Sequence, residues 1–471
     1  MSPSRPPAAS PDRADAPAES LTRALARLLA RPVGAEDRAR AARHVLDWAG
    51  CAVAGAATAQ GRGLAGFLPA YGAGPCAVVG RGRTGPPAGA AFLNGGLGNV
   101  LEMDDIHRTS ILHPGPVVIP AALAAAESQG ASAEAFLDAV VRGYEATIRI
   151  GESVGPGHYA QWHNTATCGP FGAAVAACGL MGGGEDATVW ALGNAGTQAA
   201  GPWRMRHERA PSKQLHTARA AEAGLAAGWL AAEGFAGPEF ILEGAQGFYA
   251  GMAPDPVPEA VTAGPGDRWR IWEVSFKPWP ACRHAHPTLD AALALRARGV
   301  RAADVAAFRV ETYADAVRFC DRPAPETELE AKFSLQHAVA VALSEGAPEL
   351  AHFTPEAAAR ADLAALRAKG QVAAAEPYAA AYPRRYGAAV TVRLADGAEL
   401  TEAAPDALGD PDNPLDEARL IAKAEALCEA GGFAPAQAAR LVETALALAD
   451  PGADAPAAFA AALSDPPKEP R

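Results

Sequence analysis

The sequence predicts a mainly helical protein in which an α+β segment separates two helical stretches. Alanine is abundant and aromatic residues make up only 6% of the chain, and alanine favours helices because it loses no side-chain entropy on ordering. From Ser20 to about Ala253, and again from Leu415 onward, apolar residues recur at helical spacing. Between these stretches, runs of β-branched and aromatic residues predict strands. A chain of 471 residues is long for one domain, so we expect two.

In the first helical stretch, two helices can be placed from their end signals. Ser132 is a typical N-cap, and it precedes a single apolar stripe over residues 136–148. An alanine-rich helix over residues 219–233 is expected to stop at Gly234. Stretches of small residues such as 172–178 predict helices that pack closely against one another.

The composition changes after Ala253. Residues 254–266 hold four prolines and two glycines, which indicates a linker. Strands are predicted at 269–276, 307–313 and 388–394, with helices at 287–298 and 334–344 between them. At the other end of the chain, residues 1–19 are rich in Pro, Ala, Ser and Asp, and they predict a disordered tail rather than a signal peptide.

Charge and cysteine usage narrow the class of protein. The net charge of -12, from 41 Lys and Arg against 53 Asp and Glu, argues against a nucleic-acid partner, which requires a basic patch. The seven cysteines are widely spaced and form no CxxC pair, so reduced thiols in a cytoplasmic protein fit better than disulfides or a zinc site. No stretch is long and apolar enough for a membrane span. An acidic protein that binds an anion must gather its cations in one pocket.

The first candidate site segment begins at Asn94. It contains two adjacent acids, Asp104 and Asp105, followed by His107 and His113. Such a group can bind a metal ion or share a proton, and it can equally be a helix end with solvated acids. The residues alone leave both interpretations open.

Two further segments each hold one candidate. His163 begins a Thr- and Gly-rich turn before a small-residue helix, where it could lie beside a bound anion. The alternative is an ordinary helix start in which Thr165 or Thr167 caps free amides. Lys213 stands at the entrance of a helix, where a lysine is more often a surface residue.

The densest group of cations lies in residues 276–286. One lysine, one arginine and two histidines fall within ten residues and are flanked by two prolines: Lys277, Arg283, His284 and His286, with Pro278 and Pro280. A rigid cationic turn of this kind suits a di- or tricarboxylate. Here we favour a functional role over a purely structural one.

Together these segments resemble the MmgE/PrpD family, which includes 2-methylcitrate dehydratase, cis-aconitate decarboxylase and iminodisuccinate epimerase. The resemblance runs from about Leu21 to Leu463. Its markers, in chain order, are LNGGLGNVLEMDDIH followed by HPG, RGYEATIRIG, HNTATCGPFGAA, SKQLHTARAAEAG, GFAGPEFILEG, FKPWPACRHAH and GDPDNPL. The resemblance implies a large all-helical domain, residues 20–267 plus 406–471, with an inserted smaller α+β domain, residues 268–405. It also implies a site in the cleft between the two domains, and a homodimer.

The sequence departs from the family pattern within the implied site. Where the family has a stretch resembling His-x-Leu-Asp-x-Asp-Asp-Thr, this chain has Asn99, Glu102 and Ile106 at the first, fourth and last places. A tyrosine common in the family after Phe-Ser-Leu is His337 here. The resemblance therefore does not fix the substrate.

The resemblance implies lyase-type chemistry on the carbon next to a carboxylate of a small di- or tricarboxylic acid. Dehydration of the 2-methylcitrate type is our first expectation, and decarboxylation of the cis-aconitate type or epimerisation of the iminodisuccinate type is the alternative. Each reaction builds negative charge beside a carboxylate, which cations fixed in advance stabilise. No metal and no organic cofactor is implied, and the chain has no GxGxxG unit or P-loop.

Roles for individual residues follow from the same resemblance. Lys213, Lys277 and Arg283 are expected to stabilise the developing charge. His113 and His163 are assigned to proton transfer, with Asp104 orienting a histidine or acting as an acid. The remaining substrate-binding candidates are His107, His284 and His337. Asp105 is expected to anchor the local backbone.

Two other classes of function stay open. One is a metal-dependent hydrolase that uses Asp104, Asp105, His107 and His113 as ligands. The other is a non-catalytic carboxylate-binding protein on an enzyme fold, which the substituted site positions favour.

Overall fold

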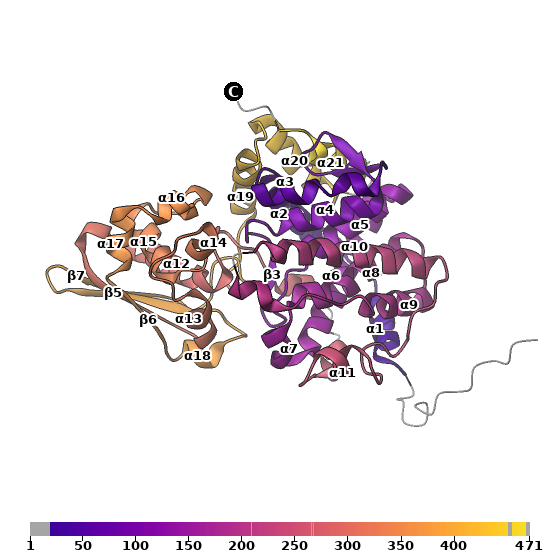
Figure 1. The fold of residues 1–471 in the computed structure, drawn as a ribbon, viewed down its shortest axis with the longest axis horizontal. Coiled ribbons are helices and arrows are strands. Elements are labelled where there is room, and N and C mark those ends of the chain that lie inside the picture. The colour runs from indigo at the N-terminus through magenta and orange to yellow at the C-terminus, as the bar shows by residue number, and fades with distance from the viewer. Residues whose placement is uncertain (1–18, 209, 265, 267, 451–454, 468–471) are drawn as a thin grey trace, which may run out of the picture.

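A computed structural model describes residues 19–208, 210–264, 266, 268–450 and 455–467. The chain forms a large helical unit and a smaller α+β unit beside it (Figure 1). The predicted fold class is thereby confirmed. Of the expected N-terminal tail, all but the last residue lies outside the described residues. Within the described parts of the chain, every helix is too short or too polar to cross a membrane.

The large unit is built from both ends of the chain, and in Figure 1 the yellow C-terminal helices lie against the indigo N-terminal ones. Its N-terminal helices are α1 (Leu21–Leu29), α2 (Ala35–Ala56), α3 (Ala59–Ala65), α4 (Pro87–Gly98), α5 (Gly115–Gln129), α6 (Ala133–Ser153), α7 (Gly155–Gln161), α8 (Asn164–Leu180), α9 (Glu185–Gly196), α10 (Ser212–Ala232) and α11 (Phe248–Met252). Its C-terminal helices are α19 (Glu417–Ala430), α20 (Pro435–Ala447) and α21 (Ala455–Ser464). Two antiparallel strand pairs join them: β1 (Cys76–Val78) with β2 (Arg83–Gly85), and β3 (Ile106–His107) with β4 (Val274–Ser275).

Small residues set the close packing of α6, α8 and α10. A Cβ added to Gly172 of α8 would lie 2.0 Å from Oγ1 of Thr147 on α6. A Cβ added to Gly224 of α10 would lie 2.3 Å from Cβ of Ala173 on α8. Because these distances are far below a van der Waals contact, only glycine permits the helices to approach so closely. The packing predicted from the small-residue stretch is therefore confirmed.

The helix ends follow the sequence signals at some positions and not at others. The hydroxyl of Ser132 accepts a hydrogen bond from the Ala135 amide and caps α6, as predicted. After α10, Gly234 adopts a φ of +88°, a conformation that favours glycine. The start of α10 differs from the prediction, because the helix begins at Ser212 rather than at residue 219. Lys213 therefore lies in its first turn.

The smaller unit carries a four-stranded mixed sheet in the order β6-β5-β7-β8. Its strands are β5 (Val305–Thr312), β6 (Gly370–Ala374), β7 (Ala388–Leu394) and β8 (Glu399–Ala404). Its helices are α12 (His286–Ala297), α13 (Ala314–Cys320), α14 (Glu328–Lys332), α15 (Leu335–Ser344), α16 (Pro355–Ala358), α17 (Ala361–Arg367) and α18 (Tyr378–Ala381). Strands β5 and β6 are parallel, and the other two pairs are antiparallel. Leu289 of α12 and Val339 of α15 share a core with Val310 and Val390 of the sheet.

The segment 269–276, predicted as a strand of the α+β domain, has a different structure. It forms a 3₁₀ turn, η5 (Arg270–Glu273), followed by the two-residue strand β4. Trp269 and Phe276 are buried in the core of the large unit. A short apolar run predicts burial but does not say against which unit it packs, and this is why the strand prediction was wrong. This packing favours a domain boundary after Phe276, while the full division of the chain stays a prediction.

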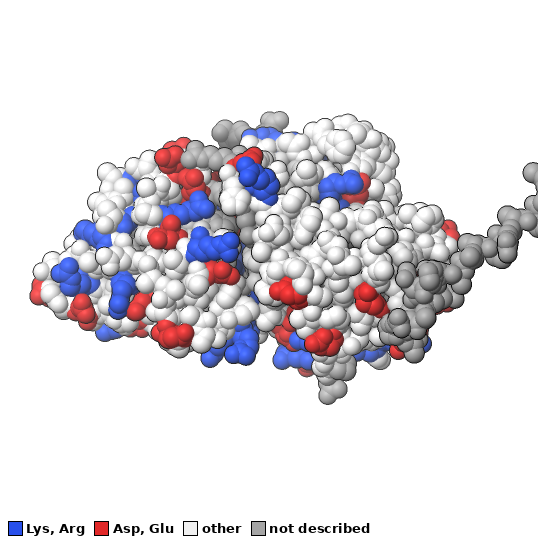
Figure 2. Space-filling model, turned by 60° about the horizontal axis from the view of Figure 1, so that its bottom comes forward, with Lys and Arg blue, Asp and Glu red and all other residues white. Residues whose placement is uncertain are grey.

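The surface charges are mixed in sign. In Figure 2, the described Lys and Arg side chains on the visible face stand interspersed with Asp and Glu. Three buried lysines, Lys277, Lys332 and Lys423, contact the turn that follows α4.

Candidate active site

The centre of the candidate site is the turn between α4 and β3, residues 99–105, which we call the acid turn. Asn99 ends α4, and Glu102 adopts a φ of +60°, which is uncommon for a residue with a side chain. Glu102, Asp104 and Asp105 are at most 4% exposed as whole residues. The interpretation of this segment as a helix end with solvated acids is therefore wrong.

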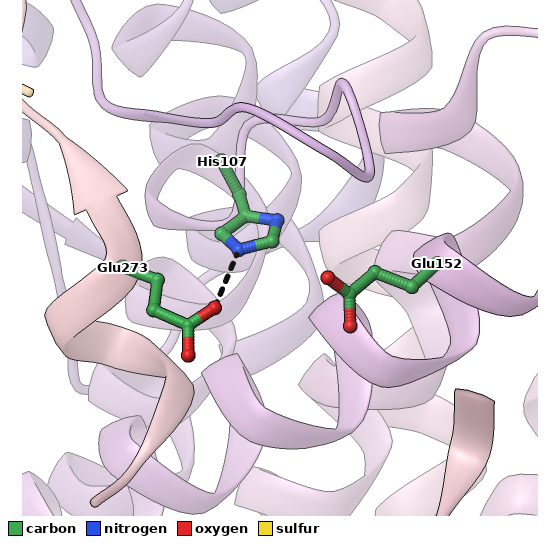
Figure 3. Close-up of side chains that lie close together, drawn as sticks. All are labelled: His107, Glu152 and Glu273. Atoms are coloured by element: carbon green, nitrogen blue, oxygen red, sulfur yellow. Dashed lines mark ion pairs between the residues drawn. The ribbon is translucent and has the colours of Figure 1, made fainter. Parts of the chain in front are cut away.

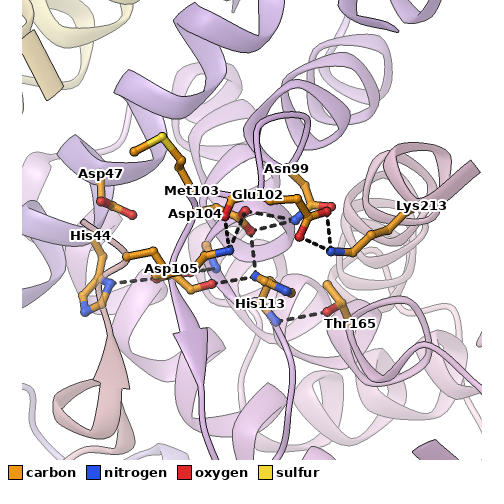
Figure 4. A network of polar contacts seen from close by, with 12 residues as sticks. His44, Asp47, Asn99, Glu102, Met103, Asp104, Asp105, His113, Thr165 and Lys213 are labelled. Carbon is orange, nitrogen blue, oxygen red and sulfur yellow. Dashed lines mark hydrogen bonds and ion pairs between the residues drawn. The ribbon is translucent and has the colours of Figure 1, made fainter. Parts of the chain in front are cut away.

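Asp104 is held by three groups (Figure 4). The Asn99 side-chain amide donates to both carboxylate oxygens, at 3.0 and 2.9 Å. Nδ1 of His113 lies 2.9 Å from Oδ2. Nζ of Lys277 lies 3.8 Å from Oδ1. Burial by itself would raise the pKa of the Asp104 carboxyl, but His113 and Lys277 outweigh burial and hold that pKa well below its usual range. Asp104 is therefore an anion at neutral pH.

Lys213 and Lys277 approach Glu102 from different parts of the chain. Nζ of Lys213, on α10, lies 2.6 Å from both carboxylate oxygens of Glu102 (Figure 4). Nζ of Lys277, which follows β4, donates to the main-chain carbonyl of Glu102. Burial would raise the pKa of the Glu102 carboxyl, but the two lysines and His113 lower it overall. Burial lowers the pKa of the Lys277 ammonium.

Two more lysines bind the same backbone. Lys332 of α14 donates to the carbonyl of Leu101 at 3.2 Å, and Lys423 of α19 donates to the carbonyl of Met103 at 2.6 Å. With Lys277, three ammonium groups thus bind three consecutive carbonyls of the acid turn. Because these lysines come from the smaller unit, the connecting segment and the C-terminal helices, the turn is a junction of the whole fold.

His113 is fixed in one orientation at the start of α5. Its Nδ1 lies 2.9 Å from both Oδ2 of Asp104 and the main-chain oxygen of Asp105. Both oxygens are acceptors, so Nδ1 carries a hydrogen. Among the described contacts of this ring, none involves Nε2, and 9% of the side chain is exposed. Nε2 is therefore the atom through which His113 can exchange a proton with a substrate.

Asp105 points away from His113 and has a structural role. Its carboxylate lies 2.7 Å from Nδ1 of His44, accepts a hydrogen bond from the Tyr144 hydroxyl at 2.7 Å, and accepts another from the Gly115 amide at 3.0 Å. A Cβ on Gly115 would lie 2.7 Å from Oδ1, so glycine is required here. Burial raises the pKa of Asp105 to about 6. The structure thus confirms that Asp105 anchors the local backbone.

His163 contacts His216 on α10, the helix that carries Lys213. It occupies the N-cap position of α8, its Nδ1 is 3.3 Å from Nδ1 of His216, and its ring is 4.5 Å from that of Trp203. His216 follows Lys213 by one helical turn, and burial and Lys213 lower the pKa of its imidazole. Whether His163 transfers a proton stays a prediction.

The threonines after His163 do not act as helix caps. The hydroxyl of Thr165 accepts a hydrogen bond from the His113 amide at 3.0 Å (Figure 4). The hydroxyl of Thr167 lies 2.8 Å from Nε2 of His158. The start of α8 is therefore tied to His113, which brings the second candidate segment to the acid turn.

Of the four basic residues in 276–286, Lys277 is the one that reaches the acid turn through the described contacts. Arg283 forms an ion pair with Asp410, which neutralises its charge. Nδ1 of His284 lies 2.8 Å from the Tyr313 hydroxyl, within an aromatic cluster of the smaller unit. Nε2 of His286 lies 3.1 Å from the carbonyl of Ala281. Successive side chains of this turn thus contact different partners, and substrate binding by Arg283 and His284 stays a prediction.

His337 lies in the smaller unit, on α15. Its Nε2 lies 2.8 Å from the carbonyl of His352, and its Nδ1 lies 3.2 Å from the guanidinium of Arg367. The side chain is fully buried in the smaller unit, and burial lowers the pKa of its imidazole to about 4. Both ring nitrogens are engaged with groups of the smaller unit, and substrate binding by His337 stays a prediction.

The four residues proposed as metal ligands of a hydrolase do not come together at one point. Asp104 and His113 contact each other, whereas Asp105 faces His44 and His107 lies on β3. A different group has the composition of a metal site: His107, Glu152 and Glu273, whose ligand atoms lie within 4.8 Å of one another (Figure 3).

Arg270 already supplies a positive charge to this group. Its guanidinium lies 2.9 Å from Glu273 and 3.7 Å from Glu152. The Ser110 amide donates to Nδ1 of His107 at 3.4 Å, so Nε2, which faces Glu273 at 3.5 Å, carries the hydrogen. A metal ligand needs that nitrogen unprotonated. The arrangement therefore favours a partly exposed salt-bridge network, and it leaves substrate binding by His107 as a prediction.

Sequence reasoning missed several residues of the site. Glu102 and Asn99 were noticed only as departures from the family pattern, and the structure makes them the partners of Lys213 and Asp104. Lys423 could have been found, because it lies on the buried stripe of α19 with Leu420 and Leu427. A lysine in such a position requires a buried partner, which here is Asp47 at 2.5 Å.

Comparison with known proteins agrees with the resemblance. Similar proteins include the cis-aconitate decarboxylase-like protein oryM of Aspergillus oryzae, 32% identical over 46% of this chain and 48% of the relative, and the cis-aconitate decarboxylase of Aspergillus terreus, 31% identical over 48% and 49%. The chain thus matches about half the length of these fungal relatives. The human cis-aconitate decarboxylase is 26% identical over 72% of each chain. Two family models match in order, the MmgE/PrpD N-terminal domain over residues 19–260 and the MmgE/PrpD C-terminal domain over residues 279–449. On these two matches, the chain belongs to the MmgE/PrpD family.

Proposed function

We propose that this chain is a lyase that removes CO2 from a small unsaturated tricarboxylic acid, with cis-aconitate as the first substrate to test. The observation that carries the proposal is the position of Lys213, Lys277 and His113 around one buried turn. Two cations and one group able to transfer a proton are what decarboxylation beside a carboxylate requires. The substrate acid and, by the family resemblance, a second copy of the chain are the partners that we propose.

The chemical step defines what each group does. The bond between the CH2 carbon of cis-aconitate and its carboxylate breaks, and its electron pair forms a double bond to the central carbon. The original double-bond pair moves to the CH carbon, where the adjacent carboxylate delocalises the charge. A proton from an acid then completes the product, a methylene dicarboxylic acid. Fixed ammonium groups lower the barrier because they need no reorganisation as the charge develops.

The lysines differ in ways that suit different parts of this step. The Lys213 side chain is 17% exposed, so it can turn from Glu102 to a substrate carboxylate. The Lys277 side chain is 1% exposed and bound to the backbone, so it provides a fixed charge. His113 supplies the proton from Nε2, while Asp104 holds Nδ1. His163 is the second proton donor to test.

The relatives decide our preference among the three reactions of the family. Dehydration of the 2-methylcitrate type was the first expectation from the sequence. The relatives reported above are named as cis-aconitate decarboxylases or decarboxylase-like, which supports decarboxylation over dehydration and epimerisation. The identities of about 30% support this choice without fixing the acid.

A proton NMR assay in D2O separates the candidate reactions. The purified chain is incubated with cis-aconitate, 2-methylcitrate or iminodisuccinate, and substrate loss and deuterium incorporation are followed together. Decarboxylation predicts that cis-aconitate is consumed and that each product molecule gains one deuterium. Consumption of 2-methylcitrate alone would return dehydration to first place, and deuterium exchange without net loss would favour epimerisation. Inertness towards all three acids would support the carboxylate-binding alternative.

A further inference from the structure

A cavity outside the acid turn has the features of a second anion site. It has a volume of about 240 Å³ and is lined by Arg40 and Arg43 of α2, by Phe276, and by Leu415 and Leu420 near the start of α19. This volume is smaller than that of pockets for drug-sized ligands, so it suits a small metabolite.

Arg40 is the charged group of this cavity that has no counter-ion. Its guanidinium lies 4.5 Å from the centre of the Phe276 ring and donates to the carbonyl of Val274 at 2.7 Å. Among the described residues no carboxylate forms an ion pair with Arg40, and its Nε is buried without a hydrogen bond. Burial and the neighbouring Arg43 lower the pKa of Arg40 to about 10. A partly buried cation in this state is stabilised by an anion that reaches it.

The other charged groups of the cavity are already paired. Arg43 lies 2.8 Å from Glu417, and the Asp416 carboxylate, which caps α19, lies 3.4 Å from Nε of Arg419. One positive charge is thus left for a ligand. The N-terminus of the 14-residue helix α19 adds a partial positive charge on the same side.

We propose that this cavity binds a small organic monocarboxylate, with its carboxylate on Arg40 and its hydrocarbon part against Phe276, Leu415 and Leu420. A single unpaired cation favours a monoanion over phosphate or a dicarboxylate. The apolar side chains favour a ligand with a short hydrocarbon part over an inorganic ion.

The proposed site adjoins the acid turn but uses different residues. His44 follows Arg40 by one helical turn, stacks on Phe276 with ring centres 4.4 Å apart, and lies 2.7 Å from Asp105. Lys213, which binds Glu102 of the acid turn, does not line the cavity. Binding at the two places can therefore be separated by mutation, whatever reaction the acid turn performs.

Isothermal titration of the full chain with sodium butanoate tests the proposal, with 1-butanol and sodium phosphate as probes that carry only the tail or only the charge. We expect saturable butanoate binding, weakened at least about tenfold by Arg40→Met, because a charge-assisted pair is lost. Arg268→Met is the matched control, because Arg268 also lies over an aromatic ring, 4.2 Å from that of Trp272, and does not line the cavity. This control is expected to bind butanoate like the wild type.

Two more variants keep the test decisive. Lys213→Met is expected to retain butanoate binding. Loss of butanoate binding in this variant would place the ligand at the acid turn and overturn the proposal. Leu415→Trp is expected to fill the cavity and abolish binding without changing any charge, so it decides the question if Arg40→Met does not fold. Absence of saturable binding, equal binding by Arg40→Met, or equal affinity for phosphate or butanol would each overturn the proposal.

Discussion

Lys277 and Asp104 form an ion pair that the protein encloses almost completely. Nζ lies 3.8 Å from Oδ1, and 1% of each side chain is exposed. The same ammonium binds the carbonyl of Glu102, whose carboxylate binds Lys213. Lys277 therefore joins the Asp104 carboxylate to the backbone of Glu102, and its removal affects both the fold and the chemistry.

Replacing Lys277 by methionine leaves Asp104 buried without its lysine. We expect Lys277→Met to lower the free energy of unfolding by about 3 kcal/mol, because breaking a buried pair leaves an uncompensated charge. Urea denaturation measures this change. The double variant Lys277→Met, Asp104→Asn is expected to lose less than the sum of the two single changes. The matched control is Lys369→Met, which removes a lysine that donates to the Val305 carbonyl away from the turn and is expected to lose about 1 kcal/mol. Equal losses for the two lysines would contradict the buried-pair account.

Removal of Lys213 is expected to affect turnover more than stability. Its side chain is 17% exposed, and Lys277 keeps its contact with the main-chain carbonyl of Glu102. We expect Lys213→Ala to reduce kcat by at least about a hundredfold while lowering Tm by only a few degrees, because the lost cation acts on the transition state. Arg219→Ala, an exposed change on the same helix, is the control for the helix itself. Turnover within a few-fold of the wild type would remove Lys213 from the mechanism.

The raised pKa of Asp105 predicts a pH dependence of stability. Its folded pKa is about 6, against an ordinary value of 3.8, so between these values the folded state holds a proton that the unfolded state has lost. The stability from this group is therefore complete below about pH 4 and is lost as the pH rises through about 6. Comparing the wild type with Asp105→Asn by denaturation from pH 4 to 7 isolates this contribution, which we expect to be about 1–3 kcal/mol. Parallel pH curves for the two proteins would show that Asp105 does not titrate in this range.

His163 tests whether one histidine or two transfer protons. The His163→Gln variant keeps much of the volume and hydrogen bonding but cannot carry a proton at neutral pH. If His163 is a proton donor, the rate of deuterium incorporation at saturating substrate falls by about a hundredfold or more with little change in affinity. His216→Gln is the natural comparison, because its ring contacts that of His163. A loss of affinity with an unchanged rate at saturation would make His163 a ligand for the substrate.

The sequence predicted those features that depend on local chemistry. Ser132 capped its helix, β7 matched its predicted range, and the small residues of α8 marked a close helix contact. Strands β6 and β8 were missed because most of their residues are partly or fully exposed and carry no large apolar pattern.

The sequence predicted which chain segments meet at the site, but not where each side chain points. Asp104, His113, Lys213 and Lys277 come together as expected, because helices α5 and α10 and strand β4 end or begin at the acid turn. The basic residues after Lys277 were expected to act with it, but closeness along the chain does not determine where a side chain points. Arg283 pairs with Asp410 and His337 contacts Arg367, and both partners are far away in the sequence, so residue spacing does not predict these contacts.

The central claim is that His113, held by Asp104, delivers the proton in a decarboxylation at the acid turn. It is tested most directly by the rate at which wild type and His113→Gln convert cis-aconitate in D2O, followed by proton NMR at saturating substrate. The account predicts a product with one added deuterium from the wild type. It also predicts a fall of at least about a hundredfold in the variant, with Kd for the substrate nearly unchanged. Conversion by the variant within a few-fold of the wild type would contradict the claim.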